Sequence, residues 1–403
     1  EALEEKAPIV FTPERKKNYN FVKYAAVITL FLAGGFYGGK TYYDNQIETQ
    51  TLLVQKQVQE KVNHKIQEAT FFISNPLNSV ELTVKEELKT YHIIAPHIHH
   101  TQVVTCPDLN EELGGGYLFK PESLQITGSF KVRGALSAIS RLSKDELKRG
   151  VIAYSSGNHA QGVAHAAKVF NTPATVVMPT DAPSRKIANA RELGAEVIFY
   201  NRRTESREEM SAEIAKEKNL VLINPYDALE TIYGQGTAAY EVIQDVNNPK
   251  LDNAIICAGG GGLTAGSCIS IKHINPQCNV FTAEPDEWND HQQSFEKNAR
   301  VAVDINRGGL CDGIMTPTPG EIPFAINQHY GVKGLSASDK MVCNAMSFAF
   351  NRLNLKLEPS GAIALACLLD NKEKFKNSRT LIMLSGGNVD EKTFTDCLSK
   401  ATQ

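Results

Sequence analysis

The sequence predicts an α/β fold, in which two lobes of open parallel sheet carry helices on both faces, preceded by an N-terminal helical extension. Two observations predict this fold. From about residue 76 onward, short apolar runs alternate with amphipathic stretches, which indicates strands joined by helices. Several apolar runs also end directly in glycine-rich loops. Because ligands of open α/β sheets bind beyond the carboxyl ends of the strands, we expect a site at these loops.

The middle of the chain shows the alternation most clearly. Its apolar runs have the length of strands, and the amphipathic stretches between them have the length of helices. Strands are expected at 151–154, 174–178, 196–200, 220–224, 253–258 and 380–384, and helices at 158–170, 185–193 and 206–218. We assign residues 150–227 to a small lobe and residues 76–149 and 228–403 to a large lobe.

Residues 1–75 differ from the rest of the chain. The segment 24–39 is uncharged and slightly shorter than the roughly 17–25 residues of a membrane-spanning helix. We expect a single membrane anchor there, followed by a polar helical stalk over 44–68; the alternative is a helix packed inside the protein or on a partner. Basic residues before the segment predict a cytoplasmic N-terminus, which would place the remainder of the chain across the membrane.

Composition narrows the function. A net charge of -3 and the lack of a basic stripe interleaved with aromatics give no basis for nucleic-acid binding. The eight cysteines form no CxxC pair and several stand in apolar runs, which favours a reduced, cytoplasmic catalytic part. A cytoplasmic catalytic part conflicts with the topology that the basic residues predict, in which the catalytic part lies across the membrane from the cytoplasm. Both interpretations stay open.

The loop 257–266 is the most informative segment. It places Gly259, Gly260, Gly261 and Gly262 between a buried strand and a helix. Successive backbone N–H groups can converge on an anion in such a loop, and the helix dipole adds positive potential. No lysine follows at the position that a P-loop requires, which disfavours a nucleoside triphosphate. The loop therefore predicts a phosphate cradle.

Three further loops carry reactive or polar groups. Lys131 lies in a Gly-Ser-rich turn before a helix, where desolvation would lower its pKa and suit it to imine formation. Together with the phosphate cradle, it suggests a cofactor with both an aldehyde and a phosphate. The loop 155–162 offers N–H and hydroxyl groups for a carboxylate, and Asn158 can hydrogen-bond a phenolic oxygen. Ser385 ends a strand with its hydroxyl available.

These four motifs together resemble the serine/threonine dehydratase and serine racemase family, which are pyridoxal-phosphate enzymes of fold type II, similar to the tryptophan synthase β-subunit. The resemblance extends from about residue 85 to 395, with the motifs in family order. It rests on Ser129-Phe-Lys131-Val-Arg-Gly, Ser156-Gly-Asn-His, the glycine run and Ser385-Gly-Gly-Asn.

The resemblance implies a role for each motif. Lys131 would hold the cofactor covalently and later remove the Cα proton of the substrate. Asn158 would meet the ring hydroxyl and Ser385 the pyridine nitrogen, and the glycine run would bind the phosphate. The substrate carboxylate would lie against Ser155, Asn158 and His159.

Two residues bear on the substrate within the family. Ser156 stands where many threonine dehydratases carry alanine and serine racemases carry serine, and a hydroxyl facing the lysine could exchange a proton on the other face of Cα. A small polar filler is the alternative interpretation. Arg207 matches an arginine that can meet a second carboxylate in serine racemases, although a solvated surface charge is the alternative.

The resemblance also implies a cation site and an assembly state. Glu284 and Asp290, with the carbonyl of Trp288, match the spacing of a magnesium or calcium site, although relatives carry a small residue in place of the tryptophan. A homodimer is expected by analogy. The predicted activity is α,β-elimination from serine, threonine or 3-hydroxyaspartate. The alternatives are serine racemisation and, from another class, a membrane-tethered homologue without catalysis.

Overall fold

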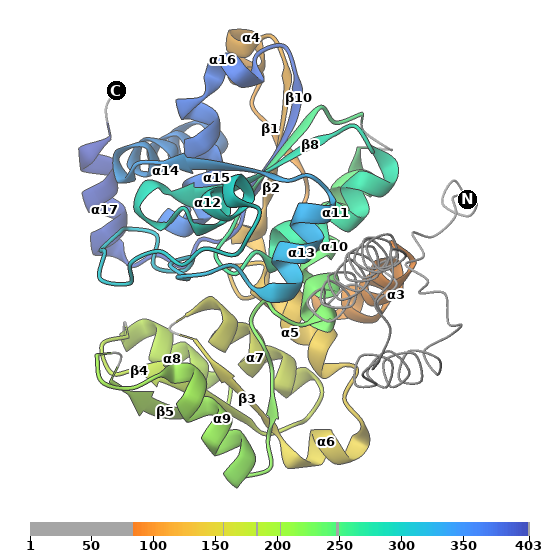
Figure 1. Cartoon of the computed structure of the whole chain (residues 1–403), viewed down its shortest axis with the longest axis vertical. Helices are drawn as coiled ribbons and strands as arrows, with labels where there is room; N and C mark the ends of the chain where they lie inside the picture. Colours follow the sequence, from red (N-terminus) through yellow and green to blue (C-terminus); the bar gives the residue numbers. More distant parts are fainter. Residues whose placement is uncertain (1–83, 156, 183, 202, 247–249, 402–403) are drawn as a thin grey trace, which may run out of the picture. The chain divides into compact units, whose positions relative to one another are not determined.

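The computed structural model describes residues 84–401 except Ser156, Pro183, Arg202 and 247–249 (Figure 1). The chain separates into two units, residues 1–81 and residues 82–403, and only the second is described below. The predicted membrane anchor at 24–39 and the stalk over 44–68 lie outside the described residues.

Two sheets form the framework of the described unit. The larger has the strand order β1-β2-β10-β7-β8-β9 and is parallel except for the antiparallel pair of β1 and β2. The smaller has the order β5-β4-β3-β6 and is parallel throughout. The strands are β1 (Val104–Thr105), β2 (Gly116–Pro121), β3 (Val151–Tyr154), β4 (Ala174–Pro179), β5 (Glu196–Tyr200), β6 (Val221–Leu222), β7 (Asn253–Cys257), β8 (Asn279–Pro285), β9 (Lys333–Ala337) and β10 (Arg379–Leu384).

Helices cover both faces of each sheet. In the larger sheet, α14, α15 and α17 lie on one side and α10, α11 and α13 on the other (Figure 1). The helices are α3 (Val84–Ile94), α4 (Pro107–Leu113), α5 (Lys131–Ile139), α6 (Lys144–Arg149), α7 (Asn158–Val169), α8 (Ser184–Glu192), α9 (Arg207–Glu217), α10 (Leu229–Asp245), α11 (Gly262–Ile274), α12 (Asp290–Lys297), α13 (Glu321–His329), α14 (Asp339–Leu353), α15 (Pro359–Asp370), α16 (Lys372–Phe375) and α17 (Glu391–Lys400), with 3-10 helices at Ala95–His97, Glu122–Leu124 and Asp286–Trp288.

Strand β3 of the smaller sheet is apolar and buried along its whole length. Val151 and Ala153 of β3 pack in the cluster that contains α7, whereas Ile152 and Tyr154 pack with residues of α9. Successive side chains of a strand point to opposite faces, so a strand that is buried on both faces has no polar alternation. Helix α5 packs against both α7 and α10 and links the helices of the two sheets.

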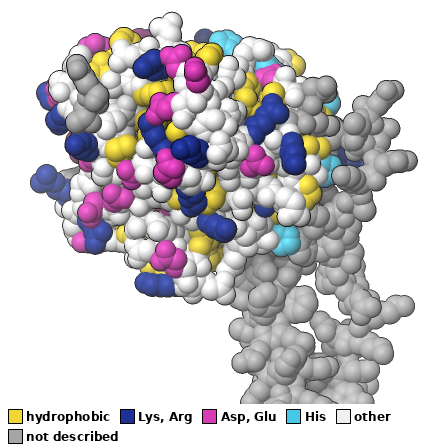
Figure 2. Space-filling model, turned by 90° about the horizontal axis from the view of Figure 1, so that it is seen from above, with side chains coloured by type: hydrophobic (Ala, Val, Ile, Leu, Met, Phe, Trp, Pro, Cys, Tyr) yellow, Lys and Arg dark blue, Asp and Glu magenta, His cyan; other side chains and the backbone are white. Residues whose placement is uncertain are grey.

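The described helices bear on the predicted membrane anchor. Figure 2 shows Lys and Arg side chains interspersed with Asp and Glu side chains over the coloured part of the visible face. Within residues 84–401, and leaving aside the few positions not described, every helix is too short or too polar to span a bilayer. This finding contradicts the predicted transmembrane helix for the described residues, whereas the segment 24–39 itself lies outside them.

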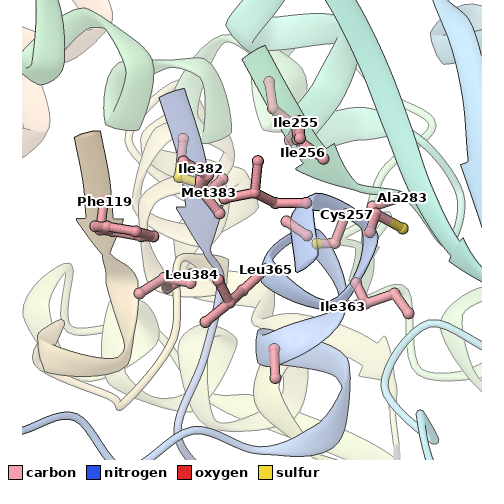
Figure 3. Close-up of a cluster of buried hydrophobic side chains, with 14 of the residues drawn as sticks. Phe119, Ile255, Ile256, Cys257, Ala283, Ile363, Leu365, Ile382, Met383 and Leu384 are labelled. Carbon is pink, nitrogen blue, oxygen red and sulfur yellow. The ribbon is translucent and has the colours of Figure 1, made fainter. Parts of the chain in front are cut away.

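The core of the larger sheet fixes where the predicted loops begin. Figure 3 shows side chains of β7 and β10, among them Ile255 and Ile382, packed with Ile363 and Leu365 of α15. The strands expected at 253–258 and 380–384 are observed within one residue of those bounds. The strand expected at 220–224 is shorter, because β6 is an edge strand that pairs only with β3. The boundaries proposed for the two lobes stay a prediction.

Candidate active site

The lining of one pocket includes residues from four predicted loops that are far apart in the sequence. Three of these loops follow β3, β7 and β10, and the fourth is the turn that leads into α5. The sequence-predicted residues that line it are Lys131, Ser155, Asn158, His159, Arg207, Gly259, Gly260, Gly261, Gly262 and Ser385. Ser156 lies outside the described residues. The carboxyl ends of buried strands thus converge on one cavity, as expected for this class of fold.

The glycine loop connects β7 to α11 with its carbonyl groups held by other elements. The Nε2 atom of His291 lies 2.8 Å from the carbonyl oxygen of Gly259, and the Gly320 N–H donates to the Gly260 carbonyl at 3.1 Å. Burial lowers the pKa of His291 to about 4, so the ring is neutral and donates this bond. The first N–H groups of α11 have no partner within the helix, which leaves them available to an anion.

Close packing explains why this loop consists of glycines. A Cβ atom at Gly260 would lie 2.2 Å from the ring of Tyr226, and one at Gly261 would lie 2.4 Å from Cε1 of His291. Gly261 also has a φ of 88°, in the left-handed region that favours glycine. A side chain at either position would displace its neighbour and close the cradle.

Lys131 is the first residue of α5. Its Nζ atom donates a hydrogen bond to the carbonyl oxygen of Pro225 at 2.9 Å. Burial lowers the pKa of Lys131 to about 8, and the charge of Arg207 acts in the same direction. A lysine with such a pKa has a larger neutral, nucleophilic fraction near pH 7 than an exposed lysine.

The loop after β3 leads into α7, and Ser155, Gly157, Asn158 and His159 line the pocket there. The hydroxyl of Ser155 accepts from the Gly157 N–H at 3.1 Å, which fixes the turn. Burial, reinforced by the charge of Lys131, lowers the pKa of His159 to about 3, and its Nε2 donates to the Ile223 carbonyl at 3.0 Å. Nδ1 of His159 is then an acceptor, and it has no partner among the described residues. A carboxylate can therefore use the backbone N–H of His159 but not its ring.

Ser385 is fixed relative to Lys131 by main-chain hydrogen bonds. Its carbonyl accepts from the Phe130 N–H at 3.2 Å, and the Gly387 N–H donates to the Gly128 carbonyl at 2.9 Å. Its hydroxyl lies 3.4 Å from the carbonyl oxygen of Ser360, which is a weak contact that a ligand can replace.

Comparison with known proteins agrees with this geometry. The family model for pyridoxal-phosphate dependent enzymes matches residues 94–386. The chain is 40% identical over 317 residues to L-threo-3-hydroxyaspartate ammonia-lyase of Saccharomyces cerevisiae, which covers 79% of this chain and 96% of that relative. It is 40% identical over 300 residues to serine racemase of Schizosaccharomyces pombe, covering 74% of this chain and 92% of the relative. The crystal structure of serine racemase from Dictyostelium discoideum matches with a TM-score of 0.71 and 37% identity, covering 77% of this chain and 99% of that chain.

The chain belongs to the pyridoxal-phosphate-dependent serine/threonine dehydratase and serine racemase family. Its fold is that of fold type II enzymes, as predicted. The family model and the relatives also confirm pyridoxal phosphate as the cofactor of the family.

In this family member, Arg207 belongs to the pocket. Its guanidinium carbon lies 5.5 Å from the centroid of the Tyr154 ring, and its Nε donates to Glu208 at 2.7 Å. The side chain is 31% exposed, so it is partly shielded from solvent, and its role in substrate binding stays a prediction beside the alternative of a solvated charge. The Tyr154 ring lies against the guanidinium, as in a cation–π contact.

The residues of the predicted cation site lie together but outside the pocket lining. The carboxylate of Glu284 accepts from the N–H groups of His291 and Gln292 at 2.8 and 2.9 Å, at the start of α12. Both carboxylate oxygens of Asp290 are buried without a partner among the described residues. Trp288 is buried, and its Nε1 donates to the Gly308 carbonyl at 3.2 Å. Residues 84–401, apart from the undescribed positions, contain no group of three or more His, Cys, Asp or Glu residues that could hold a metal ion.

Several pocket residues were missed from the sequence. Glu358 lines the pocket, and Asn388 hydrogen-bonds Asn158 behind it. Pro225 supplies the carbonyl that accepts from Lys131. Asn388 stands within the quoted Ser385-Gly-Gly-Asn motif and could have been found there, whereas Glu358 has no comparable local signal.

Proposed function

We propose that this protein catalyses the pyridoxal-phosphate-dependent α,β-elimination of a β-hydroxy amino acid to a 2-oxo acid and ammonia. The observation that carries the proposal is the position of the Lys131 amine, whose pKa is lowered to about 8 by burial, in the same pocket as the glycine loop and Ser385. Relatives named for this type of elimination support it.

The residues present fit the cofactor. The glycine loop is a cradle that a Cβ atom would fill, and its position at the start of α11 suits a phosphate. When bound, pyridoxal phosphate supplies an aldehyde for the lysine and a ring that accepts electrons from the substrate Cα. Ser385 can hydrogen-bond the ring nitrogen, but a neutral hydroxyl cannot keep that nitrogen protonated as a carboxylate would. Ser385 would therefore make the bound ring a weaker electron acceptor than a carboxylate would, which suits elimination.

Each group of the pocket has a separate role in binding the substrate or moving a proton. The N–H groups at the start of α7, with the Ser155 hydroxyl, bind and orient the substrate carboxylate. Asn158 would donate to the phenolic oxygen of the bound cofactor. Lys131 would be the base that takes the Cα proton, because its depressed pKa leaves a substantial fraction of the amine neutral near pH 8.

Arg207 supports a substrate with a second carboxylate. A guanidinium stacked on Tyr154 and already paired with Glu208 is held in one orientation, so it loses little conformational freedom on binding. We therefore propose 3-hydroxyaspartate as the preferred substrate, with serine and threonine as weaker ones. Serine racemisation by Lys131 and Ser156 is the second candidate, and the serine racemases among the relatives favour it.

We further propose that a divalent cation, Mg²⁺ or Ca²⁺, binds at Glu284 and Asp290, near the Trp288 carbonyl. Burial raises the pKa of Asp290 to about 8, and burial together with the Asp290 charge raises the pKa of Glu284. Two adjacent buried carboxylates need a proton or a cation between them. The expected result is a higher thermal midpoint with either cation in the wild type but not in Asp290→Asn. An equal rise in the variant would contradict the site.

We also propose a homodimer, by analogy with the family. Light scattering of the purified full chain should give about twice the 44.2 kDa mass of one chain. A mass of one chain at micromolar concentration would contradict it.

The decisive experiment for the activity combines absorbance with product analysis. Wild-type protein with pyridoxal phosphate should absorb at about 410–420 nm, and Lys131→Ala should lose this band. Keto-acid and chiral amino-acid analysis with 3-hydroxyaspartate, serine and threonine then separates elimination from racemisation. Wild-type protein that stays colourless would overturn the proposed function.

A further inference from the structure

Glu358 is a buried acid in the pocket to which the motifs assign no role. It precedes α15, is 3% exposed and lines the cavity. Its Oε1 atom accepts a hydrogen bond from Nδ2 of Asn158 at 2.5 Å, although the two residues are 200 positions apart in the sequence. The hydrogen bond therefore joins the loop after β3 to the N-terminus of α15.

The opposite end of the Asn158 amide is held as well. Its Oδ1 accepts from Nδ2 of Asn388 at 2.9 Å, and Asn388 also donates to the Thr127 carbonyl at 2.8 Å. When ionised, the carboxylate of Glu358 only accepts hydrogen bonds, so together with the Asn388 donor at the other end it turns the amide nitrogen of Asn158 toward itself. One N–H of that group is used by Glu358, and the other stays free to donate to a ligand.

Glu358 occupies its position at an energetic cost. Its carboxylate packs so closely on the Ser385–Asn388 loop that a Cβ atom at Gly386 would lie 2.2 Å from Oε1. Burial raises the pKa of Glu358 to about 7, opposed by the charge of Lys186, while Asp312 acts with burial. Lys186 itself pairs with Asp312 at 3.2 Å, and no Lys or Arg of the described chain forms a salt bridge with Glu358. A buried acid without a paired cation destabilises the fold, so its presence in a ligand pocket indicates a role in binding.

We propose that Glu358 is a positioning residue that orients the Asn158 amide so that its free N–H meets the phenolic oxygen of the bound cofactor. The proposal rests on the proposed function, because it assigns that contact to Asn158. In this role Glu358 acts through its hydrogen bond to Asn158, and the proposal needs no contact of Glu358 itself with substrate or cofactor.

The test measures cofactor binding and the colour of the bound cofactor in the full chain. Cofactor-free protein is titrated with pyridoxal phosphate for five proteins. These are the wild type, the single variants Glu358→Ala, Glu358→Gln and Asn158→Ala, and the double variant that combines Asn158→Ala with Glu358→Ala. We expect Glu358→Ala to weaken cofactor binding about tenfold and to shift the absorption maximum, as the loss of a buried hydrogen bond to a charged group would. Glu358→Gln should recover most of the affinity and the wild-type maximum, because its amide oxygen still accepts from Asn158.

The double variant separates positioning from a general loss of stability. It should bind the cofactor no more weakly than Asn158→Ala alone, because the two residues act in sequence. Glu87→Gln is the matched control, since Glu87 is buried, hydrogen-bonds Ser270 and lies outside the pocket. It should leave affinity and spectrum unchanged.

Two results would overturn the inference while the proposed function stands. One is a coloured Glu358→Ala protein with wild-type affinity and spectrum. The other is that Glu358→Ala weakens cofactor binding by the same factor in the Asn158→Ala background as in the wild type. If Glu358→Ala does not fold, Glu358→Gln is compared in the wild type and in the Asn158→Ala background. The inference is contradicted if Glu358→Gln lowers cofactor affinity as much as Asn158→Ala does. It is also contradicted if the affinity losses of the two substitutions add up in the double variant.

Discussion

The Nζ atom of Lys131 donates to the carbonyl oxygen of Pro225 across 2.9 Å, from the start of α5 to a residue 94 positions later in the chain. A single hydrogen bond to a neutral carbonyl holds this amine but supplies no charge to keep it protonated. Burial therefore dominates, and the pKa of Lys131 is lowered to about 8.

This pKa predicts how the stability of the cofactor-free protein depends on pH. The folded lysine releases its proton at a lower pH than the unfolded lysine, so the unfolded state binds more protons between about pH 8 and 10 and stability rises there. Below pH 8 the buried charge destabilises the fold. Lys131→Met should thus be more stable than the wild type at pH 7, on the order of 2 kcal/mol, and the difference should shrink toward pH 10. Urea unfolding at several pH values measures this, and a constant difference contradicts it.

Gly261→Ala should weaken cofactor binding at least about tenfold, because the new methyl group meets His291 and the left-handed φ becomes strained. Gly308→Ala is the matched control, since a Cβ atom there meets nothing within 4 Å. Titration of both cofactor-free variants with pyridoxal phosphate compares their affinities for the cofactor. Equal affinities would mean that the loop is not the phosphate cradle.

Arg207→Leu should lower kcat/KM for 3-hydroxyaspartate about 10- to 100-fold, the loss expected for one charge-assisted hydrogen-bonded pair. It should change kcat/KM for serine much less, because serine has no second carboxylate. Lys216→Met, on the exposed part of the same helix, should leave both values unchanged. A parallel loss for both substrates would remove Arg207 from substrate selection.

Arg133→Met should destabilise the fold by about 3–5 kcal/mol, because it leaves two buried carboxylates without their main partner. Arg133 binds Glu122 through Nε at 2.7 Å and Glu241 through Nη2 at 2.7 Å, and all three side chains are inaccessible to solvent. Arg352→Met breaks an exposed pair with Asp108 and should cost less than about 1 kcal/mol. Denaturant unfolding compares the two, and similar losses would contradict the assignment of the buried cluster as a stabilising unit.

Sequence reasoning located the loops of the site because their strands have a strong local signal. β7 and β10 are buried on both faces, so they read as continuous apolar runs, and each ends in glycines or polar residues at the pocket. The same reasoning could not find Glu358, because a glutamate before Pro359 is an ordinary helix start. Its contact with Asn158 depends on how two sheets are placed in space. Arg207 was ambiguous for the same reason, since only the tertiary structure brings it to Tyr154.

The buried cluster around Arg133 also limits how the amine at position 131 can move. The two residues share the first turn of α5, and the guanidinium is anchored on both sides by carboxylates. The backbone at the start of α5 is therefore held in place. When Nζ of Lys131 moves from one partner to another during the reaction, the movement comes from rotation about the four side-chain bonds of the lysine.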